Sequence, residues 1–439
     1  MTEDSRYRQY TPRPLEIIDT TLREGQQTSL MHDHFKYFFT RQDKEELLRA
    51  LIVCGVKFVE LFAPVVSAQE AADFAALKDV RDSLITQKGY TFLLAHVRCH
   101  PRDVESAIAA GADGLNFYIG TSPESRAFNH GRQLDQIVAQ AQPLIEDVRK
   151  NHPGLILRFS GEDAFRTRIG DLCHVYDAIA PLVDRLGLPD TVGVATPATV
   201  VDRVAALRER YPAMDFEGHF HEDRGFSLVN TLEAVRGGVR FMNTTVLGIG
   251  ERSGITSMTA LLFNLFLDHA YDALEGYHLR GLYPLNVLTA DKLKMLVPPR
   301  EPVSLTNRTH TAGVHQNAVL NGASAYEAHP LDQFGVNESE ILLGPLSGWN
   351  IIHYFLKEIR YYELDEDKAR EIAAIFKQRV YLESPETPPE QVLIAIADEL
   401  GLRKLQLPEG RHEIVQRLDG GERARPAGAA GFALPAHGR

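Results

Sequence analysis

The sequence predicts an α/β protein: a (β/α)8 TIM barrel followed by a smaller, mainly helical C-terminal module. Three observations lead to this prediction. Short apolar runs rich in β-branched residues recur roughly every 25–40 residues over the first three-fifths of the chain. Stretches with helical periodicity lie between them, and strands that alternate with helices indicate a parallel sheet. There are eight such runs, which is the number that closes a barrel.

The eight expected strands are short and are separated by helices. In chain order they cover residues 15–22, 58–62, 91–97, 114–119, 155–160, 191–195, 216–221 and 241–247. The clearest helical patterns between them cover residues 43–53, 104–110, 134–149, 200–210 and 228–235. An open, doubly wound sheet is the competing fold. It is disfavoured because no run is followed by a GxGxxG turn that leads into a helix.

The strand pattern stops near residue 280, and this sets the expected domain boundaries. We expect an N-terminal arm over residues 1–13, the barrel over 14–280 and a helical module over 281–404. The tail, residues 405–439, becomes rich in Gly, Ala and Pro, a composition typical of disorder. We therefore expect the tail to be disordered.

Composition and charge narrow the class of protein. Hydrophobic residues make up 44% of the 439 residues and charged residues 24%, which is ordinary for a globular protein. The net charge of -12 argues against a general nucleic-acid binder, which needs a basic surface. Cys54, Cys99 and Cys173 are too widely spaced for a disulfide framework or a Cys-rich zinc site. With no signal peptide and no run of ~18 apolar residues, we expect a soluble, cytoplasmic protein that does not bind membranes.

Polar side chains gather where the expected strands end. In a parallel barrel the chemistry lies at the C-terminal ends of the strands. The ionisable, amide and hydroxyl side chains at or just after these ends include Arg23, Glu24, Gln27, Glu60, His96, Arg158, Ser160, Thr191, His219 and His221. A purely structural barrel does not need so many ionisable groups at one rim. We therefore expect these residues to form a functional site.

Two histidines and a glutamate are candidate metal ligands. His219 and His221 are two residues apart on an expected strand, so both imidazoles face the same side. The alternative is a pair of hydrogen-bonded histidines without a metal. Glu24 ends the first strand, which lies beside the seventh and eighth in a closed barrel. The three side chains would form a site for Mg²⁺, Mn²⁺, Fe²⁺ or Zn²⁺ whose open positions suit a bidentate 2-oxo acid.

Hydrogen-bond donors at other strand ends indicate an acidic ligand. Arg23, His96, Arg158, Ser160 and Thr191 would converge on the same rim. Any one of them taken alone is better explained as part of a buried ion pair or as a capping group. Taken together they favour a dicarboxylate, because Arg binds carboxylates bidentately.

Several longer motifs resemble a known family. Residues 19–25 (DTTLREG), 218–223 (GHFHED) and 247–252 (LGIGER) are similar to motifs of barrel enzymes that carry out Claisen condensations with acyl-CoA. That group contains isopropylmalate, citramalate and homocitrate synthases and hydroxymethylglutaryl-CoA lyase. Over about residues 14–380 the chain resembles homocitrate synthase in particular, which has Glu, as in Glu24, where isopropylmalate synthase has Asp. Further matching segments are 95–100, 158–163, 190–197, 309–315 and 346–350.

The resemblance implies an activity and a cofactor. Homocitrate synthases are acyltransferases that condense acetyl-CoA with 2-oxoglutarate, and they use a divalent metal ion. The resemblance implies Mg²⁺, Mn²⁺ or Zn²⁺ here, with Glu24, His219 and His221 as its ligands.

The resemblance also implies roles for the remaining site residues. The residues implied in binding the 2-oxo acid are Arg23, Gln27, His96, Arg158, Ser160 and Thr191. His315 is implied as the catalytic base, oriented by Glu60 and Tyr326, and Arg23 as a further catalytic residue. In the family the helical module reaches over the active site of a partner subunit, which implies a homodimer.

Some positions depart from the family pattern. The segment between Gln27 and Thr40 is longer than in homocitrate synthases; it could reshape the 2-oxo acid pocket, act as a lid or form a surface loop. The usual Glu, Ser, Asn and Lys of the family are replaced by Gln26, Gly161, Ser253 and Asn317. These departures bear on the substrate more than on the type of reaction.

Other activities stay open at this point. Oxaloacetate, which would give citrate, is one methylene shorter than 2-oxoglutarate, and a pocket distinguishes such ligands by only ~1–3 kcal/mol. Isopropylmalate or citramalate synthase activity is a second alternative. A non-haem iron oxygenase also uses two histidines and a carboxylate, but commonly as HxD/E on a β-sandwich. A non-catalytic metabolite-binding barrel would not need Glu60, His315 and Tyr326 together.

Overall fold

The computed structural model describes residues 15–33, 37–405 and 431–434. The chain divides into two compact units, Met1–Val303 and Ser304–Arg439. The first unit extends past residue 280, where the sequence pattern placed the boundary, because helix α11 (Leu282–Lys292) packs against it. Asn286 of α11 donates a hydrogen bond to Thr259 of helix α10 (Met258–Leu267). The sequence pattern did not assign α11 to the barrel because the alternation of strands and helices ends before it, and no barrel strand follows it.

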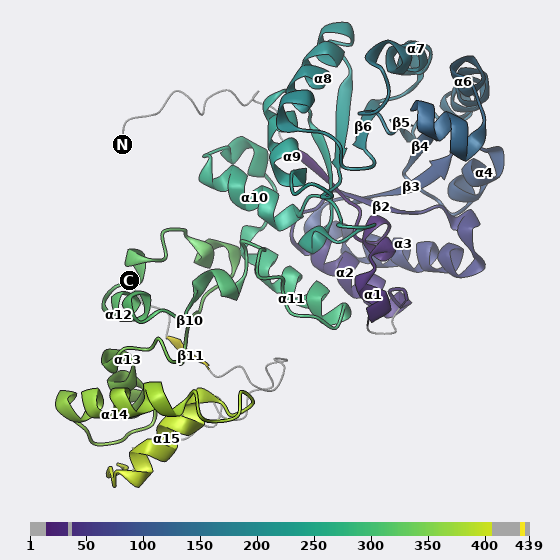
Figure 1. Ribbon diagram of the computed structural model, residues 1–439. Coiled ribbons are helices and arrows are strands. Elements are labelled where there is room, and N and C mark those ends of the chain that lie inside the picture. Colours follow the sequence, from purple (N-terminus) through teal and green to yellow (C-terminus); the bar gives the residue numbers. More distant parts are fainter. Residues whose placement is uncertain (1–14, 34–36, 406–430, 435–439) are drawn as a thin grey trace. The chain divides into compact units, whose positions relative to one another are not determined.

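The first unit is a closed barrel of eight parallel strands in the order of the sequence (Figure 1). The strands are β1 (Glu16–Asp19), β2 (Phe58–Phe62), β3 (Phe92–Arg98), β4 (Gly114–Gly120), β5 (Ile156–Glu162), β6 (Arg185–Asp190), β7 (Asp215–Phe220) and β8 (Phe241–Thr244). The barrel closes where β1 pairs with β8, with Asp19 opposite Thr244. The predicted TIM barrel is confirmed.

One expected strand was placed wrongly. Residues 191–195 were predicted to form the sixth strand, but β6 lies directly before them, at Arg185–Asp190. The strand was missed because it contains Gly187 and Pro189 and begins and ends with a charged residue. Asp190 terminates it by accepting hydrogen bonds from the backbone N–H groups of Val194 and Ala195. Thr191 therefore lies on the loop that follows the strand end.

Helices follow the strands and form the outer layer of the barrel (Figure 1). They are α2 (Arg41–Val53), α3 (Ala68–Lys88), α4 (Pro101–Ala109), α6 (Leu134–Asn151), α7 (Ile169–Ile179), α8 (Pro197–Arg210), α9 (Ser227–Arg236) and α10, with the short helices α1 (Leu30–Asp33) and α5 (Pro123–Ser125) in loops. Helix α2 shows why such segments are helical. Thr40 and Asp43 cap each other at its N-terminus, and the helix buries Leu47, Leu48 and Leu51 on one face.

The interior of the barrel changes from apolar to charged toward the C-terminal ends of the strands. Ile18, Phe58, Leu94 and Phe241 form an apolar cluster. Because alternate residues of a strand face the same side, Phe58 is followed on the inside by the fully buried Glu60. Charges buried in this way need ionic and hydrogen-bond partners, and those partners form the lower part of the site described below.

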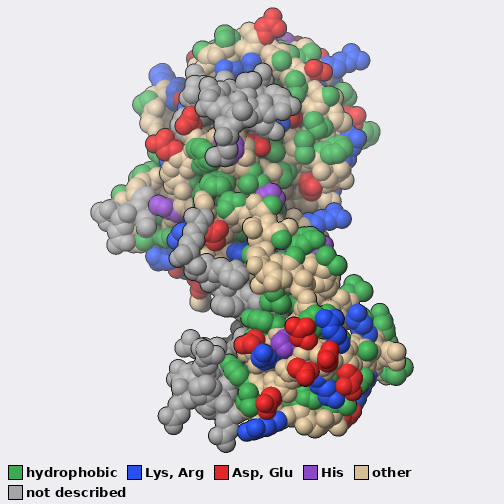
Figure 2. Space-filling view, turned by 90° about the vertical axis from the view of Figure 1, so that its left-hand side faces the viewer, with side chains coloured by type: hydrophobic (Ala, Val, Ile, Leu, Met, Phe, Trp, Pro, Cys, Tyr) green, Lys and Arg blue, Asp and Glu red, His purple; other side chains and the backbone are tan. Residues whose placement is uncertain are grey.

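The second unit is mainly helical, as predicted. Its helices are α12 (Gly313–Asn321), α13 (Trp349–Tyr354), α14 (Glu366–Arg379) and α15 (Pro389–Glu399). Its core contains the buried side chains of Ile351, Ile352, Phe355, Ile372, Phe376 and Leu393. Figure 2 shows acidic and basic side chains interspersed on the visible face of this unit, in keeping with ion pairs such as Lys368–Glu371. Such a surface is typical of a solvated helical domain.

The second unit also contains a small sheet that the sequence pattern did not predict. Strand β10 (Ser339–Leu342) pairs in parallel with β9 (Thr309–His310) and antiparallel with β11 (Gly431–Leu434). Strand β11 belongs to the tail that was expected to be disordered; the remainder of that tail after Leu405, and the expected N-terminal arm, lie outside the described residues. Among the described helices, none is both long and apolar enough to cross a membrane.

Candidate active site

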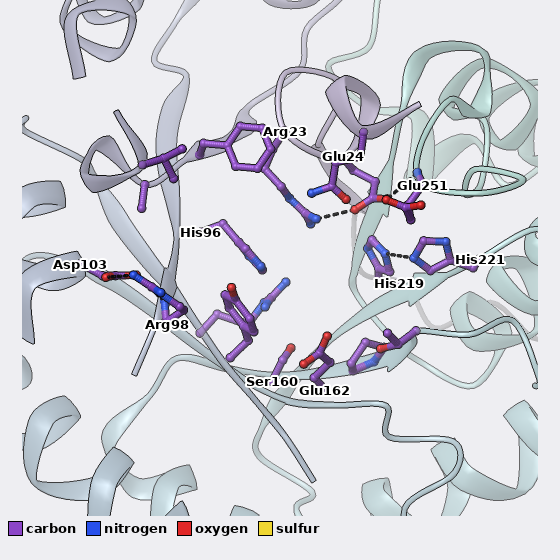
Figure 3. A pocket seen from close by; sticks show the side chains of 18 of the residues that line it. Arg23, Glu24, His96, Arg98, Asp103, Ser160, Glu162, His219, His221 and Glu251 are labelled. Carbon is purple, nitrogen blue, oxygen red and sulfur yellow. Dashed lines mark hydrogen bonds and ion pairs between the residues drawn. The ribbon is translucent and has the colours of Figure 1, made fainter. Parts of the chain in front are cut away.

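A cavity of about 680 Å³ opens at the C-terminal ends of the barrel strands (Figure 3). Its volume lies within the usual range for small-molecule sites. The residues predicted from the sequence as metal or 2-oxo acid ligands all line it: Arg23, Glu24, Gln27, His96, Arg158, Ser160, Thr191, His219 and His221. Barrel closure thus brings together side chains that are far apart in the sequence.

Glu24, His219 and His221 form a compact triad at one side of this cavity. Each can offer one ligand atom such that all these atoms lie within 4.8 Å of one another. Glu24 begins the turn after β1, His219 lies in β7, and His221 follows that strand. All three are buried, and Glu24 Oε1 accepts a hydrogen bond from the Glu251 backbone N–H at 3.0 Å.

Electrostatics keeps the triad in the forms that bind a metal. Burial lowers the pKa of His219 to about 3, with a further contribution from His221. Burial also lowers the pKa of His221. For Glu24, burial alone would raise the pKa, but Arg23 and the two imidazoles outweigh it and lower the pKa to about 2. Metal ligation needs neutral imidazole and ionised carboxylate, which are the forms favoured here at neutral pH.

The geometry of the triad fits a divalent ion. The Nε2 atoms of His219 and His221 face each other at 3.2 Å (Figure 3). Two imidazole nitrogens that share one ion at about 2.0–2.1 Å lie about 3 Å apart when they are adjacent ligands. One carboxylate and two imidazoles also form a donor set that such ions accept. The site is therefore suitable for a divalent metal ion.

Glu60 lies fully buried beneath the cavity and organises the arginines around it. Arg23 Nε donates to Glu60 Oε1 at 2.8 Å, and Asn116 donates to Glu60 Oε2. His96 Nδ1 lies 3.5 Å and Arg158 Nη2 3.8 Å from Glu60 Oε2. Burial alone would raise the pKa of Glu60, but Arg23 and His96 outweigh it and hold the pKa well below its usual range. The anionic Glu60 therefore fixes Arg23 in place.

Arg23 connects Glu60 with the triad. Besides its contacts with Glu60, its Nη1 donates to Glu24 Oε2 at 2.5 Å (Figure 3). The guanidinium is thus held between two buried carboxylates, and its side chain is only 8% exposed. This arrangement places a fixed positive charge beside the candidate metal ligands.

Ser160 and Thr191 present hydroxyl groups to the cavity. Ser160 on β5 is opposite Gly187 on β6. A Cβ atom at residue 187 would lie 1.8 Å from Ser160 Oγ, so the Ser160 side chain fits only because residue 187 is a glycine. Thr191 Oγ1 accepts a hydrogen bond from the Asp163 backbone N–H at 2.9 Å. The hydroxyl hydrogen of Thr191 stays available for a ligand, since that bond uses only an acceptor position.

Several residues of the cavity wall received no role from the sequence. Tyr118 on β4 stacks on His96, with ring centroids 4.2 Å apart. Glu162 ends β5 beside the cavity, and burial and the nearby Asp163 raise the pKa of its carboxyl group. Glu162 belongs to the polar strand ends that the sequence shows, and the position of Tyr118 near the end of an expected strand is the signal that could have identified it. Arg98, paired with Asp103, also lines the cavity (Figure 3).

His315 and Tyr326 lie in the second unit and contact each other. His315 is an exposed residue of α12, and Tyr326 follows the turn after that helix, with 43% of its surface exposed. Their rings stack with centroids 3.9 Å apart and an interplanar angle of 23°. Glu60, the other residue predicted to orient His315, belongs to the first unit.

Comparison with known proteins places the chain in a family. Residues 14–283 match the family described as HMGL-like, and residues 303–381 match the family described as homocitrate synthase post-HMGL domain-like. The cytosolic homocitrate synthase isozyme of Saccharomyces cerevisiae is 33% identical over 365 residues, which cover 83% of this chain and 81% of that protein. The mitochondrial homocitrate synthase of Schizosaccharomyces pombe is 34% identical over 365 residues, covering 82% and 83%.

Solved structures support the same fold. The HMG-CoA lyase of Bacillus subtilis superposes with a TM-score of 0.56 at 21% identity, covering 66% of this chain and 97% of that chain. The protein therefore belongs to the HMGL-like family of barrel enzymes. Within that family it is an acyltransferase of the homocitrate synthase type, as its second domain and its relatives indicate.

Proposed function

We propose that the protein condenses acetyl-CoA with 2-oxoglutarate to give homocitrate and CoA, using a divalent metal ion held by Glu24, His219 and His221. The observation that carries this proposal is that a carboxylate–imidazole triad lines the same cavity as Arg23, His96 and other donors. The names of relatives such as those of Saccharomyces cerevisiae and Schizosaccharomyces pombe support this choice of substrates.

The bound ion would polarise the ketone of the 2-oxo acid and stabilise the negative charge that develops on its oxygen. Arg23 is suited to bind the adjacent carboxylate, because Glu24 and Glu60 hold its guanidinium beside the triad. Gln27 lines the same cavity and would add an amide donor or acceptor. These contacts would orient the ketone before the carbon–carbon bond forms.

The distal carboxylate of a dicarboxylic 2-oxo acid needs donors on the other side of the cavity. We assign this role to His96, Arg158, Ser160 and Thr191, which line that cavity. Burial and the neighbouring Arg23 lower the pKa of His96, so it is a neutral hydrogen-bonding group at pH 7. Arg158 is 3% exposed, and its charge is balanced by Glu217.

We further propose His315 as the base that removes a methyl proton from acetyl-CoA, with Tyr326 and Glu60 as its orienting residues. Stacking on Tyr326 engages a face of the imidazole and leaves the nitrogens at the ring edge free to accept a proton. The resulting carbanion would attack the ketone, and water would then hydrolyse the thioester. In a homodimer the second unit of one subunit would complete the site of its partner.

The test is to measure thiol release from acetyl-CoA with 2-oxoglutarate, oxaloacetate, pyruvate or 2-oxoisovalerate, each with Mg²⁺, Mn²⁺ or Zn²⁺. We expect the highest kcat/KM with 2-oxoglutarate, about 10–200-fold above oxaloacetate. Chelation of the metal should stop the reaction, and exclusion of oxygen should leave it unchanged. A higher kcat/KM with another 2-oxo acid would reassign the substrate, and a requirement for oxygen would rule out the condensation.

A further inference from the structure

The two histidines differ at Nδ1, the ring nitrogen that does not face the candidate metal position. In His219 this atom has a hydrogen-bond partner, whereas in His221 the described residues provide none. His219 Nδ1 lies 3.1 Å from Asn243 Oδ1, and Asn243 is fully buried on β8. His221 Nδ1 is also buried but has no hydrogen-bond partner among the residues that the structure describes. The two candidate ligands from β7 and its end therefore differ in how firmly the protein orients them.

The orientation of the Asn243 amide follows from its neighbours. Its Nδ2 donates to Glu217 Oε1 at 3.0 Å, and Glu217 also faces the guanidinium groups of Arg158 and Arg185. Arg158 Nη2 lies 3.4 Å from Asn243 Oδ1 and can only donate. A flipped amide would place its oxygen against a carboxylate and its NH2 group against a guanidinium. Both contacts would be repulsive, so Oδ1 must face His219.

This orientation decides which tautomer His219 adopts. Because Asn243 Oδ1 can only accept, His219 Nδ1 must carry the hydrogen and donate it. A neutral imidazole with its hydrogen on Nδ1 has its lone pair on Nε2. Nε2 is the atom that faces His221 across the candidate metal position.

We propose that Asn243 is a positioning residue that selects the metal-binding tautomer of His219 and holds its ring, with Glu217 locking the amide in place. The inference rests on the proposed metal site, and it goes further by assigning a function to Asn243 and Glu217, two buried residues outside the set that lines the cavity. Since Arg158 shares Asn243 Oδ1 and Glu217 with this network, the same amide joins the metal ligand to the arginine proposed to bind the 2-oxo acid.

The test is Co²⁺ binding to the metal-free, full-length protein, followed by the visible absorption of the bound ion. Partners behind metal ligands typically contribute 10–100-fold to affinity, so Asn243→Leu should raise the Co²⁺ dissociation constant by about that factor. Asn243→Asp retains an acceptor for His219 Nδ1–H, and its second oxygen can carry a proton and donate it to Glu217 Oε1, as the amide does. This variant should therefore bind Co²⁺ more tightly than Asn243→Leu. Thermal unfolding of each metal-free variant shows whether the fold is intact.

Asn230→Leu is the matched control. Asn230 is likewise fully buried, but its amide donates to the Ala195 carbonyl on the outside of the barrel. A purely structural role for Asn243 predicts lower unfolding temperatures for both Leu variants and unchanged Co²⁺ affinity in both. Our inference predicts weaker binding in Asn243→Leu alone. If that variant does not fold, the shorter Asn243→Ser should show the same weakening.

The outcomes separate this inference from the proposed reaction. A folded Asn243→Leu protein with wild-type Co²⁺ affinity, or an Asn243→Asp protein as weak as Asn243→Leu, would overturn the role of Asn243. Weakened Co²⁺ binding in a protein whose wild type does not act on acetyl-CoA and 2-oxoglutarate would uphold the role and refute the reaction. A wild-type protein that binds no Co²⁺ would refute the metal site and this inference together.

Discussion

In the barrel, the candidate metal ligands are buried, and Glu24 is held by both Arg23 and the Glu251 backbone. In the second unit, His315 and Tyr326 are exposed and contact each other through stacked rings. The barrel thus fixes charged groups by surrounding each with partners. In the second unit the imidazole of His315 is exposed on the surface, and stacking on Tyr326 is the contact that orients it.

The difference suits a division of tasks. Metal and carboxylate binding benefit from groups that are already oriented, because no reorganisation is then needed during the reaction. A base that acts on a second substrate must instead be accessible to it. We therefore expect substitutions of the triad residues to weaken metal binding strongly, and substitutions of His315 to lower the rate while metal and 2-oxo acid still bind.

The largest effect is expected for the barrel triad. His219→Ala or His221→Ala should bind the divalent ion far more weakly and lose turnover, by more than the roughly 10–100-fold typical of residues behind the ligands. Metal content and thiol release measure the two effects. His152→Ala, at an exposed histidine of the same unit, is the control and should behave as wild type. Full activity in metal-stripped His219→Ala protein would eliminate the metal hypothesis.

The next effect concerns the exposed base. His315→Ala should lower kcat by about 10²–10⁴-fold, the usual contribution of a general base, while metal and 2-oxo acid still bind. His353→Ala, elsewhere in the second unit, is the control. A wild-type kcat in His315→Ala would mean that the base has been misassigned.

Mixing two inactive variants tests whether the second unit acts on a partner. In a His315→Ala/His219→Ala dimer with crossed sites, one site carries both lesions and the other carries none. Equal mixtures should then recover up to about a quarter of wild-type activity, as expected for a twofold dimer. An absence of recovery despite demonstrated subunit exchange would show that each site is built from one chain.

Asp19 should make the stability of the barrel depend on pH. Burial raises its pKa from 3.8 to about 7, so the folded state prefers the protonated form. Its stabilising contribution is present below pH 4 and lost as the pH rises to 7. The difference in unfolding free energy between wild type and Asp19→Asn should therefore fall by about 4 kcal/mol between pH 4 and 8. Urea unfolding measures it, with the exposed Asp272→Asn as control; a constant difference would contradict the prediction.

The smallest effect is expected in the second unit, and its pH dependence has the opposite sign. Burial alone would raise the pKa of Glu327, but Ser339, His310 and Arg308 outweigh it and lower the pKa. Its contribution is therefore present at neutral pH and lost in acid. Glu327→Gln should cost about 1–3 kcal/mol of unfolding free energy at pH 7 and less at pH 3. Urea unfolding at both values checks this, and a larger cost at pH 3 would reverse the assignment.

Part of this site could be predicted from local sequence. The period of two predicts that His219 and His221 face the same side at the end of the seventh strand, and short motifs at strand ends identify Glu24, Arg158 and Ser160. Such information is local, since a strand's alternation and a motif's spacing do not depend on distant contacts. The eight-fold repetition then predicted the barrel for the same reason.

Tertiary structure decided what depends on contacts between distant residues. Asn243 looks like any polar strand residue until barrel closure places it beside His219 and Glu217. Likewise, Tyr118 meets His96 only because β3 and β4 pair in a particular register. The sequence by itself therefore determined the barrel and the residues at its rim. Which partners orient those residues was decided by strand register and closure, because the free energy of a buried polar group depends on its neighbours in space.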